Sequence, residues 1–493
     1  MRHRRKSGIL LHPTSLPGPG GIGSLGRACR HFIDFLEAAG QSLWQVLPLG
    51  PAAYGNSPYS CYSAFAGNPL LIDLAALMEE GDLERADAVS DGPTNRVDFA
   101  HVEGYKLPLL RGAAARFHGH GDLARKEEFW HFCDTTPWLH DYALFMTLKE
   151  HFGGKSWNAW PREIARREPA ALEKYSVRLG VEIGEQKYIQ WQFFRQWHRI
   201  REYANVKGIG IVGDIPIFVA FDSADVWANP HLFLLDEKEK PTVVAGVPPD
   251  YFSKTGQRWG NPLYDWDAAM AEGFRWWIER FRSSFSLYDT IRVDHFRGFD
   301  ACWEVPAKEK TAVNGRWVKG PGTALFDAVI GALGELPIIA EDLGVITPDV
   351  EALRDRYRFP GMKILHFAFD SGAGNPYLPH NYTRDCVVYT GTHDNDTTLG
   401  WYQSLTQSQR KNVLAYTATS GKEITWELMR VALASVADLA IFPLQDLLGL
   451  DGSARMNLPG TPNGNWSWRF PEDLLSDALA ERLLDLTVLY GRR

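Results

Sequence analysis

The chain has 493 residues, a formal net charge of −8 and a sequence pI near 6.0. This length allows a large core and more than one lobe, and the acidic balance disfavours a surface that follows nucleic-acid phosphates. The five cysteines are widely spaced without a C-x-x-C pair, which is typical of a reducing cytosol. Because the N-terminal apolar run is too short for a secretory signal and the longest apolar stretch is interrupted by polar residues, we expect a cytoplasmic protein with neither membrane nor nucleic-acid partners.

Eight short runs rich in Val, Ile and Leu predict buried β-strands. They begin at Gly8, Ser42, Gly208, Thr290, Leu336, Gly361, Asp385 and Ala437. Apolar residues follow one another without alternation, so both faces of these strands should be buried, as in parallel sheets. Helical patterns lie between several of them, such as residues 25–40 and the segment that opens at Thr347. The sequence therefore predicts a single (β/α)8 TIM barrel over residues 1–493.

The spacing of the strands predicts two insertions into this barrel. About 160 residues separate the second and third strands, far more than one crossover needs. We expect an inserted, mainly helical subdomain over approximately residues 53–205. A second insertion, approximately residues 220–270, contains "GVPPDYFSKTGQRWGNP", whose Pro, Gly and aromatic residues are typical of a loop that covers an active site.

Ionisable side chains follow several predicted strands. Barrel enzymes carry their reacting groups at the C-terminal ends of the strands. In "TIRVDHF", the two-residue spacing places Arg292 and Asp294 on the same face, because a strand alternates its faces. A single acid at a strand end is commonly a helix cap or an ion-pair partner. The alternative is that several such side chains converge at the C-terminal rim of the barrel and form an active site. The candidates are Asp214, Asp294, Glu341, His393 and Asp394.

Two of these acids end neighbouring strands, the fourth and the fifth. Adjacent strands lie about 4.8 Å apart, so the carboxyl groups of Asp294 and Glu341 should lie roughly 5 to 6 Å apart. That separation fits a retaining glycosidase-type mechanism, whereas inverting pairs need about 6.5 to 9.5 Å. We therefore expect Asp294 to be the nucleophile, oriented by Arg292. Glu341, which follows an apolar run and faces a negative neighbour, should have a raised pKa and act as the general acid and then base.

Two further side chains, on the seventh predicted strand, should complete the site. Asp394 can accept hydrogen bonds from sugar hydroxyls that strengthen as oxocarbenium character develops, and His393 can donate others. The 18 tryptophans also suit a protein that binds sugars, because their rings are flat and partly polar, although a Trp-rich core is the alternative.

Several motifs together resemble a known family. "GDIPIF", "IRVDHFRGF", "IIAEDLG" and "GTHDNDT" resemble the conserved regions of the α-amylase superfamily, and specifically of glycoside hydrolase family 77, the amylomaltases or 4-α-glucanotransferases. The segments "YGNSPYSCYSAFAGNPLLIDL", "GVPPDYFSKTGQRWGNPLYDW" and "NLPGTPNGNWSWR" are similar to that family as well. The resemblance extends from about residue 8 to residue 470.

The resemblance implies an activity and a set of residues. It implies transfer of α-1,4-glucan segments to the 4-hydroxyl of glucose or a malto-oligosaccharide through a covalent glycosyl-Asp294, with Glu341 as acid/base and Asp394 as stabiliser. It implies no metal and no cofactor. Malto-oligosaccharides, amylose or starch, and glycogen-derived glucans would be the partners, and the chain would be a monomer or homodimer. The substrate-binding residues that it implies are Tyr59, Asp214, Arg292, His393, Trp259, Tyr251 and Asn463.

Alternatives remain at this stage. Hydrolysis of α-1,4-glucans uses the same chemistry with water as the acceptor. A metal-dependent barrel isomerase or lyase also places acids and histidines at strand ends, and undiminished activity in excess EDTA would exclude it. Tyr59 and Trp259 could serve ordinary loop packing, and Asn463 could be a turn residue.

Overall fold

The computed structural model describes residues 5–84, 94–249, 253–461 and 463–493. Eight parallel strands form one sheet in the order β10-β11-β12-β1-β2-β3-β6-β9. All eight runs predicted from the sequence form these strands, so the predicted barrel is confirmed. Their bounds are β1 Lys6–Leu10, β2 Leu43–Gln45, β3 Gly210–Pro216, β6 Thr290–Asp294, β9 Ile338–Ala340, β10 Gly361–Ile364, β11 Cys386–Tyr389 and β12 Leu439–Pro443.

The sheet curls into a nearly closed barrel. β1 pairs with β2 on one side and with β12 on the other, which places Lys6 opposite Leu439. The seam between β9 and β10 is bridged by the amide of Ala340, which donates to the carbonyl of Pro360 at 2.9 Å. β9 and β11 are buried along their whole length, as expected of strands covered on both faces.

Helices surround this barrel. Those that connect or follow its strands are α1 Arg27–Ala38, α11 Arg275–Leu287, α12 Thr323–Leu333, α13 Pro348–Arg356, α14 Thr398–Ser404, α15 Gln407–Thr417, α16 Ile424–Ala434, α17 Leu444–Leu447 and α18 Asp477–Leu489. The fully described stretch between β10 and β11 contains short 3-10 turns and no α-helix. Gly372, Gly374, Pro376 and Pro379 interrupt any helix there, so this unit departs from regular β/α alternation.

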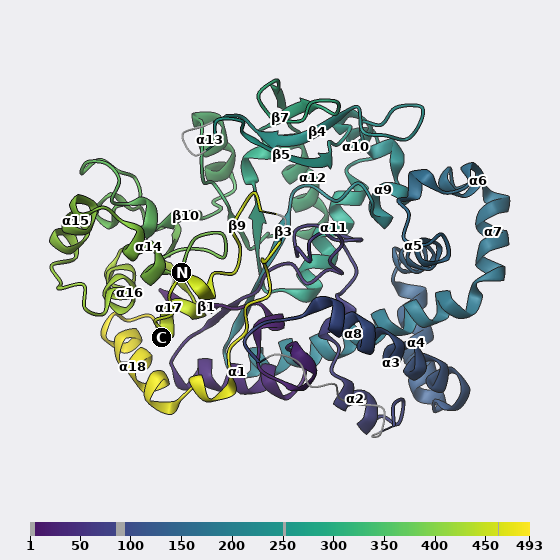
Figure 1. Ribbon diagram of the computed structural model, residues 1–493. Helices are drawn as coiled ribbons and strands as arrows, with labels where there is room; N and C mark the ends of the chain where they lie inside the picture. The colour runs from purple at the N-terminus through teal and green to yellow at the C-terminus, as the bar shows by residue number, and fades with distance from the viewer. Residues whose placement is uncertain (1–4, 85–93, 250–252, 462) are drawn as a thin grey trace.

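The long connection between β2 and β3 is mainly helical. Its helices are α2 Leu74–Glu79, α3 Phe99–His120, α4 Leu123–Thr135, α5 Leu139–His151, α6 Arg162–Ala165, α7 Pro169–Arg178 and α8 Gly180–Val206. Figure 1 shows α3 to α7 gathered on one side of the barrel. α8 returns the chain to β3, and the indole of Trp197 on α8 donates to the carbonyl of Leu287 at the end of α11 (2.9 Å). This contact joins the helical connection to the barrel wall.

A second, four-stranded antiparallel sheet lies at the C-terminal end of the barrel, in the order β5-β4-β7-β8 (Figure 1). β4 Val243–Val247 and β5 Gln257–Pro262 follow β3, together with the helices α9 Ala224–Ala228 and α10 Trp266–Ala271. β7 Ala301–Pro306 and β8 Arg316–Lys319 follow β6. The expected covering segment therefore supplies two of the four strands of this sheet. Sequence patterns did not indicate that β7 and β8, which follow the fourth barrel strand, complete it. Within the described residues, no helix is long and apolar enough to cross a membrane.

Candidate active site

The centre of the site is an arginine held between two carboxylates. Arg292 on β6 donates to Asp214 Oδ2 at 2.6 Å and to Asp294 Oδ1 at 2.9 Å, and its Nε donates to the sulfur of Met362 at 3.4 Å. The side chain of Arg292 is only 4% exposed and that of Asp214 is wholly buried, whereas the Asp294 side chain is 30% exposed. Arg292 thus fixes one oxygen of Asp294, and no hydrogen bond from a described residue reaches the other.

Register explains why these groups meet. Asp214 on β3 is paired with Arg292 on β6, and the alternation of β6 brings Asp294 to the same face two residues later. The ring of Tyr288, which precedes β6, packs directly against the main chain of β3 because Gly213 has no side chain. A Cβ there would lie 2.2 Å from the ring of Tyr288. Burial raises the pKa of Asp214 to about 7, against the opposing attraction of Arg292.

Tyr59 joins this cluster from the loop after β2. Its hydroxyl donates to Asp214 Oδ2 at 2.7 Å. Its ring is stacked on that of His393, with centroids 5.1 Å apart and planes 15° from parallel. Burial, followed by the negative charge of Asp214, raises the pKa of Tyr59, so the hydroxyl keeps its proton and remains a donor.

Glu341 lies beside Asp294 on the neighbouring strand. Val293 is paired with Ala340, and the ladder continues beyond these residues: the amide of Glu341 donates to Val293 at 3.0 Å, and that of Phe296 donates to Glu341 at 3.1 Å. Asp294 and Glu341 each directly follow one member of the Val293–Ala340 pair. Their main chains are therefore neighbours across adjacent parallel strands, about 4.8 Å apart.

The Glu341 carboxyl group is held by main-chain amides. Leu343 N–H donates to Oε1 at 2.9 Å and His295 N–H donates to Oε2 at 2.7 Å. Burial, followed by the charge of Asp294, raises the pKa of Glu341 to about 7, against the opposing effects of Arg292 and the two amides. This is the direction expected from the sequence. A carboxyl group with this pKa can both give and take a proton near neutral pH.

His295 has an unusual backbone conformation. Its φ of 54° and ψ of 48° lie in the left-handed region, which non-glycine residues seldom adopt. This conformation follows Asp294 immediately and places the His295 amide against Glu341. The His295 side chain is partly buried, and desolvation lowers its pKa to about 3, so the ring is neutral. Sequence reasoning missed His295, since a left-handed residue has no reliable signature other than glycine or asparagine.

His393 and Asp394 lie on the loop after β11. The side chain of His393 is 4% exposed and that of Asp394 is 46% exposed, and His393 Nε2 lies 3.4 Å from Asp394 Oδ1. Burial lowers the pKa of His393. Asn457, which sequence reasoning also missed, donates from Nδ2 to Asp394 Oδ1 at 2.6 Å. The signal that could have found Asn457 is its position after the eighth strand, whose loop also belongs to this rim.

The remaining candidates occupy the periphery. Trp259 on β5 is 39% exposed and meets the ring of His295 edge to face, with centroids 4.7 Å apart. Asn463 is exposed in a bend, and Tyr251 lies outside the described residues. From the loop of Asn463, it is Trp466 whose ring packs near those of Tyr59 and His393, with centroids 5.8 and 5.9 Å away.

A hollow of about 390 Å³ opens beside Trp466, between the barrel loops and the helical connection. Aromatic rings contribute to its lining, namely Tyr62, Phe99, Tyr142 and Trp466. Such surfaces suit the apolar faces of sugar rings, while polar groups at the edges can bind hydroxyls. Among the described residues, no group of three or more His, Cys, Asp or Glu side chains is arranged to hold a metal ion.

Fold and site together define an enzyme of the parallel-barrel class with paired acidic side chains at adjacent strand ends. The family model described as 4-alpha-glucanotransferase, of glycoside hydrolase family 77, matches residues 11–475. The chain is 54% identical over 500 residues to a 4-alpha-glucanotransferase of Synechocystis sp., with 100% of this chain and 99% of that protein covered. It is 52% identical over 488 residues to one of Thermus thermophilus, with 97% of each covered.

A solved structure agrees with these relatives. The amylomaltase from Streptococcus agalactiae, solved in complex with acarbose, superposes with a TM-score of 0.96 at 41% identity, covering 99% of this chain and 100% of that one. The chain belongs to glycoside hydrolase family 77, within the α-amylase superfamily. Its activity is that of a 4-alpha-glucanotransferase, as the sequence predicted.

Proposed function

We propose that this chain transfers α-1,4-glucan segments by a retaining double displacement, through a glycosyl group bound covalently to Asp294. Glu341 protonates the leaving oxygen and then deprotonates the acceptor, and Asp394 stabilises the positive charge that develops on the sugar ring. Donors are malto-oligosaccharides, amylose or starch, and glycogen-derived glucans. Acceptors are glucose and malto-oligosaccharides, which react through the 4-hydroxyl.

One observation supports this proposal above the others: Asp294 and Glu341 follow directly paired residues on neighbouring parallel strands. Carboxyl groups on such positions should lie about 5 to 6 Å apart, which suits a retaining pair and leaves no room for a water between them. The surroundings of the two acids differ in the way that the two roles require. Arg292 compensates the charge of Asp294, while Glu341 has a pKa of about 7.

In the first displacement, Asp294 Oδ2 bonds to the anomeric carbon as the bond from that carbon to the leaving sugar's O4 breaks. The proton of Glu341 goes to that O4. In the second displacement, Glu341 removes the proton of the acceptor 4-hydroxyl, whose oxygen bonds to the anomeric carbon and releases Asp294. Two inversions retain the α configuration, so the new bond has the same α-1,4 linkage as the old one.

Transfer in preference to hydrolysis depends on which hydroxyl reaches the intermediate. The sheet β5-β4-β7-β8 lies over this end of the barrel, and Trp259 extends from it to His295. A covered, aromatic-lined entrance favours a sugar that can be oriented over mobile water. The ring at the cleavage point would be held by Tyr59, Asp214, Arg292 and His393. The acceptor side or the donor chain would be bound by Trp259, Tyr251 and Asn463.

Product analysis and trapping of the intermediate test the proposal. Maltotriose incubated with the protein should give glucose together with maltopentaose and longer chains, and glucose with maltose alone would indicate hydrolysis. NMR should show that the new glycosidic bonds are α. The variant Glu341→Gln can be supplied with α-maltosyl fluoride, whose fluoride ion leaves without protonation. It should then accumulate a maltosyl adduct on the peptide that contains Asp294, and mass spectrometry would detect this adduct. Inverted products or an adduct elsewhere would contradict the mechanism.

We also propose a division of the chain that serves this function. A single catalytic barrel would extend over residues 1–493, with a mainly helical subdomain at approximately 53–205 and a covering insertion at approximately 220–270. The helices α2 to α8 and the hairpin β4–β5 lie in these ranges and support the division.

A further inference from the structure

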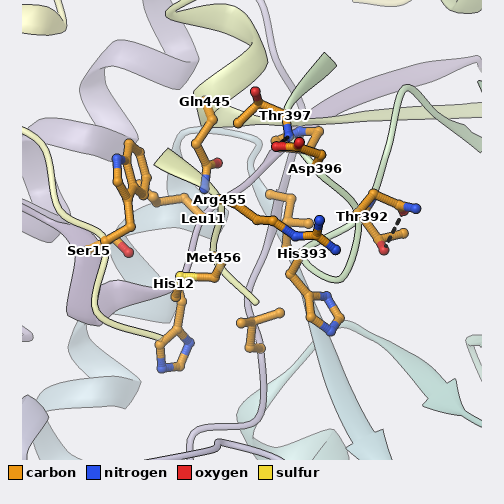
Figure 2. Close-up of a pocket in the computed structure, with 15 residues that line it drawn as sticks. Leu11, His12, Ser15, Thr392, His393, Asp396, Thr397, Gln445, Arg455 and Met456 are labelled. Atoms are coloured by element: carbon orange, nitrogen blue, oxygen red, sulfur yellow. Dashed lines mark hydrogen bonds between the residues drawn. The ribbon is translucent and has the colours of Figure 1, made fainter. Parts of the chain in front are cut away.

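The loop that carries His393 and Asp394 is held from outside by two residues after β12, Arg455 and Asn457. Arg455 Nη2 donates to the carbonyl of Asp394 at 2.6 Å, and its Nε donates to the carbonyl of Asn457 at 2.7 Å. The amide of Asn457 donates to the carbonyl of His393 at 3.1 Å. Figure 2 shows Arg455 and Met456 beside His393, around a hollow of about 20 Å³. These contacts fix the main chain of the loop.

The side chain of Asp394 is fixed separately. Asn457 Nδ2 donates to Oδ1 at 2.6 Å, and His393 Nε2 lies 3.4 Å from the same oxygen. Among the described residues, no hydrogen bond reaches Oδ2. Since the Asp394 side chain is 46% exposed, its carboxylate would otherwise rotate freely in water. The side-chain amide of Asn457 therefore selects one orientation of the Asp394 carboxylate, in which Oδ2 is free.

We propose that Asn457 is a positioning residue for glucan transfer: through its side-chain amide it holds Asp394 so that Oδ2 is presented to the sugar ring. This inference rests on the proposed role of Asp394. A preorganised acceptor helps most where charge develops, so its orientation should affect the transition state more than the bound substrate.

The ionisable groups that face Asp394 are few. His393 lies beside it on the same loop, Arg455 approaches from the segment after β12, and Tyr59, from the loop after β2, lies close enough to be influenced by its charge. His393 is neutral near pH 7, because burial lowers its pKa, so it does not replace a lost Asn457 as a charged partner. The hydrogen bond from Arg455 to Asp394 goes to the main-chain oxygen and not to the carboxylate.

The experiment compares Asn457→Ala with Asn465→Ala. Asn465 belongs to the same loop, and its side-chain hydrogen bonds to described residues all lie within that loop: it accepts from Leu458 N–H at 2.9 Å and donates to Thr461, at 2.9 Å to the carbonyl oxygen. Asn457→Ala should lower kcat for maltotriose disproportionation about tenfold to a hundredfold, as expected on losing a hydrogen bond to a charged group, with KM changed less than about threefold. Asn465→Ala should leave kcat within about threefold of the wild-type value.

A second variant keeps the shape of the side chain and removes the donor. Asn457→Asp places two carboxyl groups together, and they share a proton only at low pH. When protonated, the introduced carboxyl group can again donate to Asp394. The ratio of the variant's kcat to that of the wild type should therefore rise as the pH falls from about 7 to about 5. A ratio that stays constant over this range would contradict the role of Asn457 as a donor to Asp394.

Three results would overturn the inference: kcat of Asn457→Ala within twofold of wild type, an equal loss in Asn465→Ala, or an effect confined to KM. Asp394→Ala, measured in the same series, separates this inference from the proposed function. If Asp394→Ala remains active, the role of Asp394 is wrong. If Asp394→Ala is inactive while Asn457→Ala is unimpaired, only the inference about Asn457 fails. Thermal unfolding of each variant verifies that the folded protein is being compared.

Discussion

The two halves of the active site are built differently. On the side of β3, β6 and β9, charged groups are buried in the barrel and fix one another, with Arg292 bonded to Asp214 and Asp294. On the side of β11 and β12, Asp394 is half-exposed on a loop and is held by the neighbouring segment at Arg455 and Asn457. In the first half, the proposed catalytic groups also contribute to the stability of the fold. In the second half, geometry depends on a few hydrogen bonds that can be removed without opening the core.

The largest effect that would test this comparison is expected from Arg292→Met. It leaves Asp214 buried without its cation, which should cost about 3 to 5 kcal/mol of unfolding free energy, because an uncompensated buried charge is strongly unfavourable. It also removes the partner of Asp294, so disproportionation should fall by about 10³-fold or more. Urea unfolding and maltotriose assays measure the two effects. Arg27→Met, which breaks the exposed pair with Glu472, should change stability by less than about 1 kcal/mol.

Asp394→Asn should separate activity from stability. We expect kcat to fall about 10²- to 10³-fold, because in the proposed mechanism Asp394 supplies the charge that faces the developing cation. The unfolding free energy should change by less than about 1 kcal/mol, since the side chain is half-exposed. A stability loss as large as that of Arg292→Met would contradict the distinction between the two halves.

A pH profile should reveal the proton of Glu341. Because the pKa of Glu341 is about 7 and the proposed first displacement needs its protonated form, kcat/KM should decline about tenfold per pH unit above 7. The contribution of this proton to the free energy of unfolding should also fall as the pH rises. The folded protein binds this proton more tightly than the unfolded chain, whose pKa lies near 4.5, so the contribution to stability falls as the pH rises from about 4.5 to 7. Glu341→Gln should remove that pH dependence of unfolding, and an unchanged slope would contradict the assignment.

His295 offers a smaller test within the buried half. His295→Val places a β-branched residue in the left-handed region, which should cost about 1 to 2 kcal/mol or displace the amide from Glu341, lowering kcat about tenfold. His295→Asn loses the ring but tolerates this backbone conformation, so kcat should stay within about threefold. Equal losses in the two variants would assign the effect to the ring contact with Trp259 instead of the backbone.

The smallest effect should come from the loop half. Asn463→Ala alters an exposed side chain in a bend, and KM for maltotriose should change by no more than about threefold, with kcat unchanged. Initial rates over a range of maltotriose concentrations measure both constants. A drop in kcat comparable to that of Asp394→Asn would show that Asn463, and not Asn457 alone, supports the reacting groups.

Sequence patterns were sufficient where local rules determine the structure. Buried apolar runs located all eight barrel strands, and the two-residue spacing of Arg292 and Asp294 predicted that their side chains would meet. The absence of an α-helix between β10 and β11 was readable in Gly372 and Pro376 but was not recognised. Pairings between distant segments could not be predicted: β7 pairs with β4, and Asn457 donates to Asp394. Those depend on tertiary contacts that leave no local pattern.

The pairing of β1 with β12 affects how the chain folds while it is being synthesised. Of the barrel strands in this chain, β1 is synthesised before the others, and its neighbour β12 is complete only when synthesis has reached Pro443. Until then, β1 presents an unsatisfied row of backbone donors and acceptors, the kind of edge from which aggregation starts. Shortened chains that stop before Leu439 would keep that edge permanently, and we expect them to depend on chaperones to stay in solution.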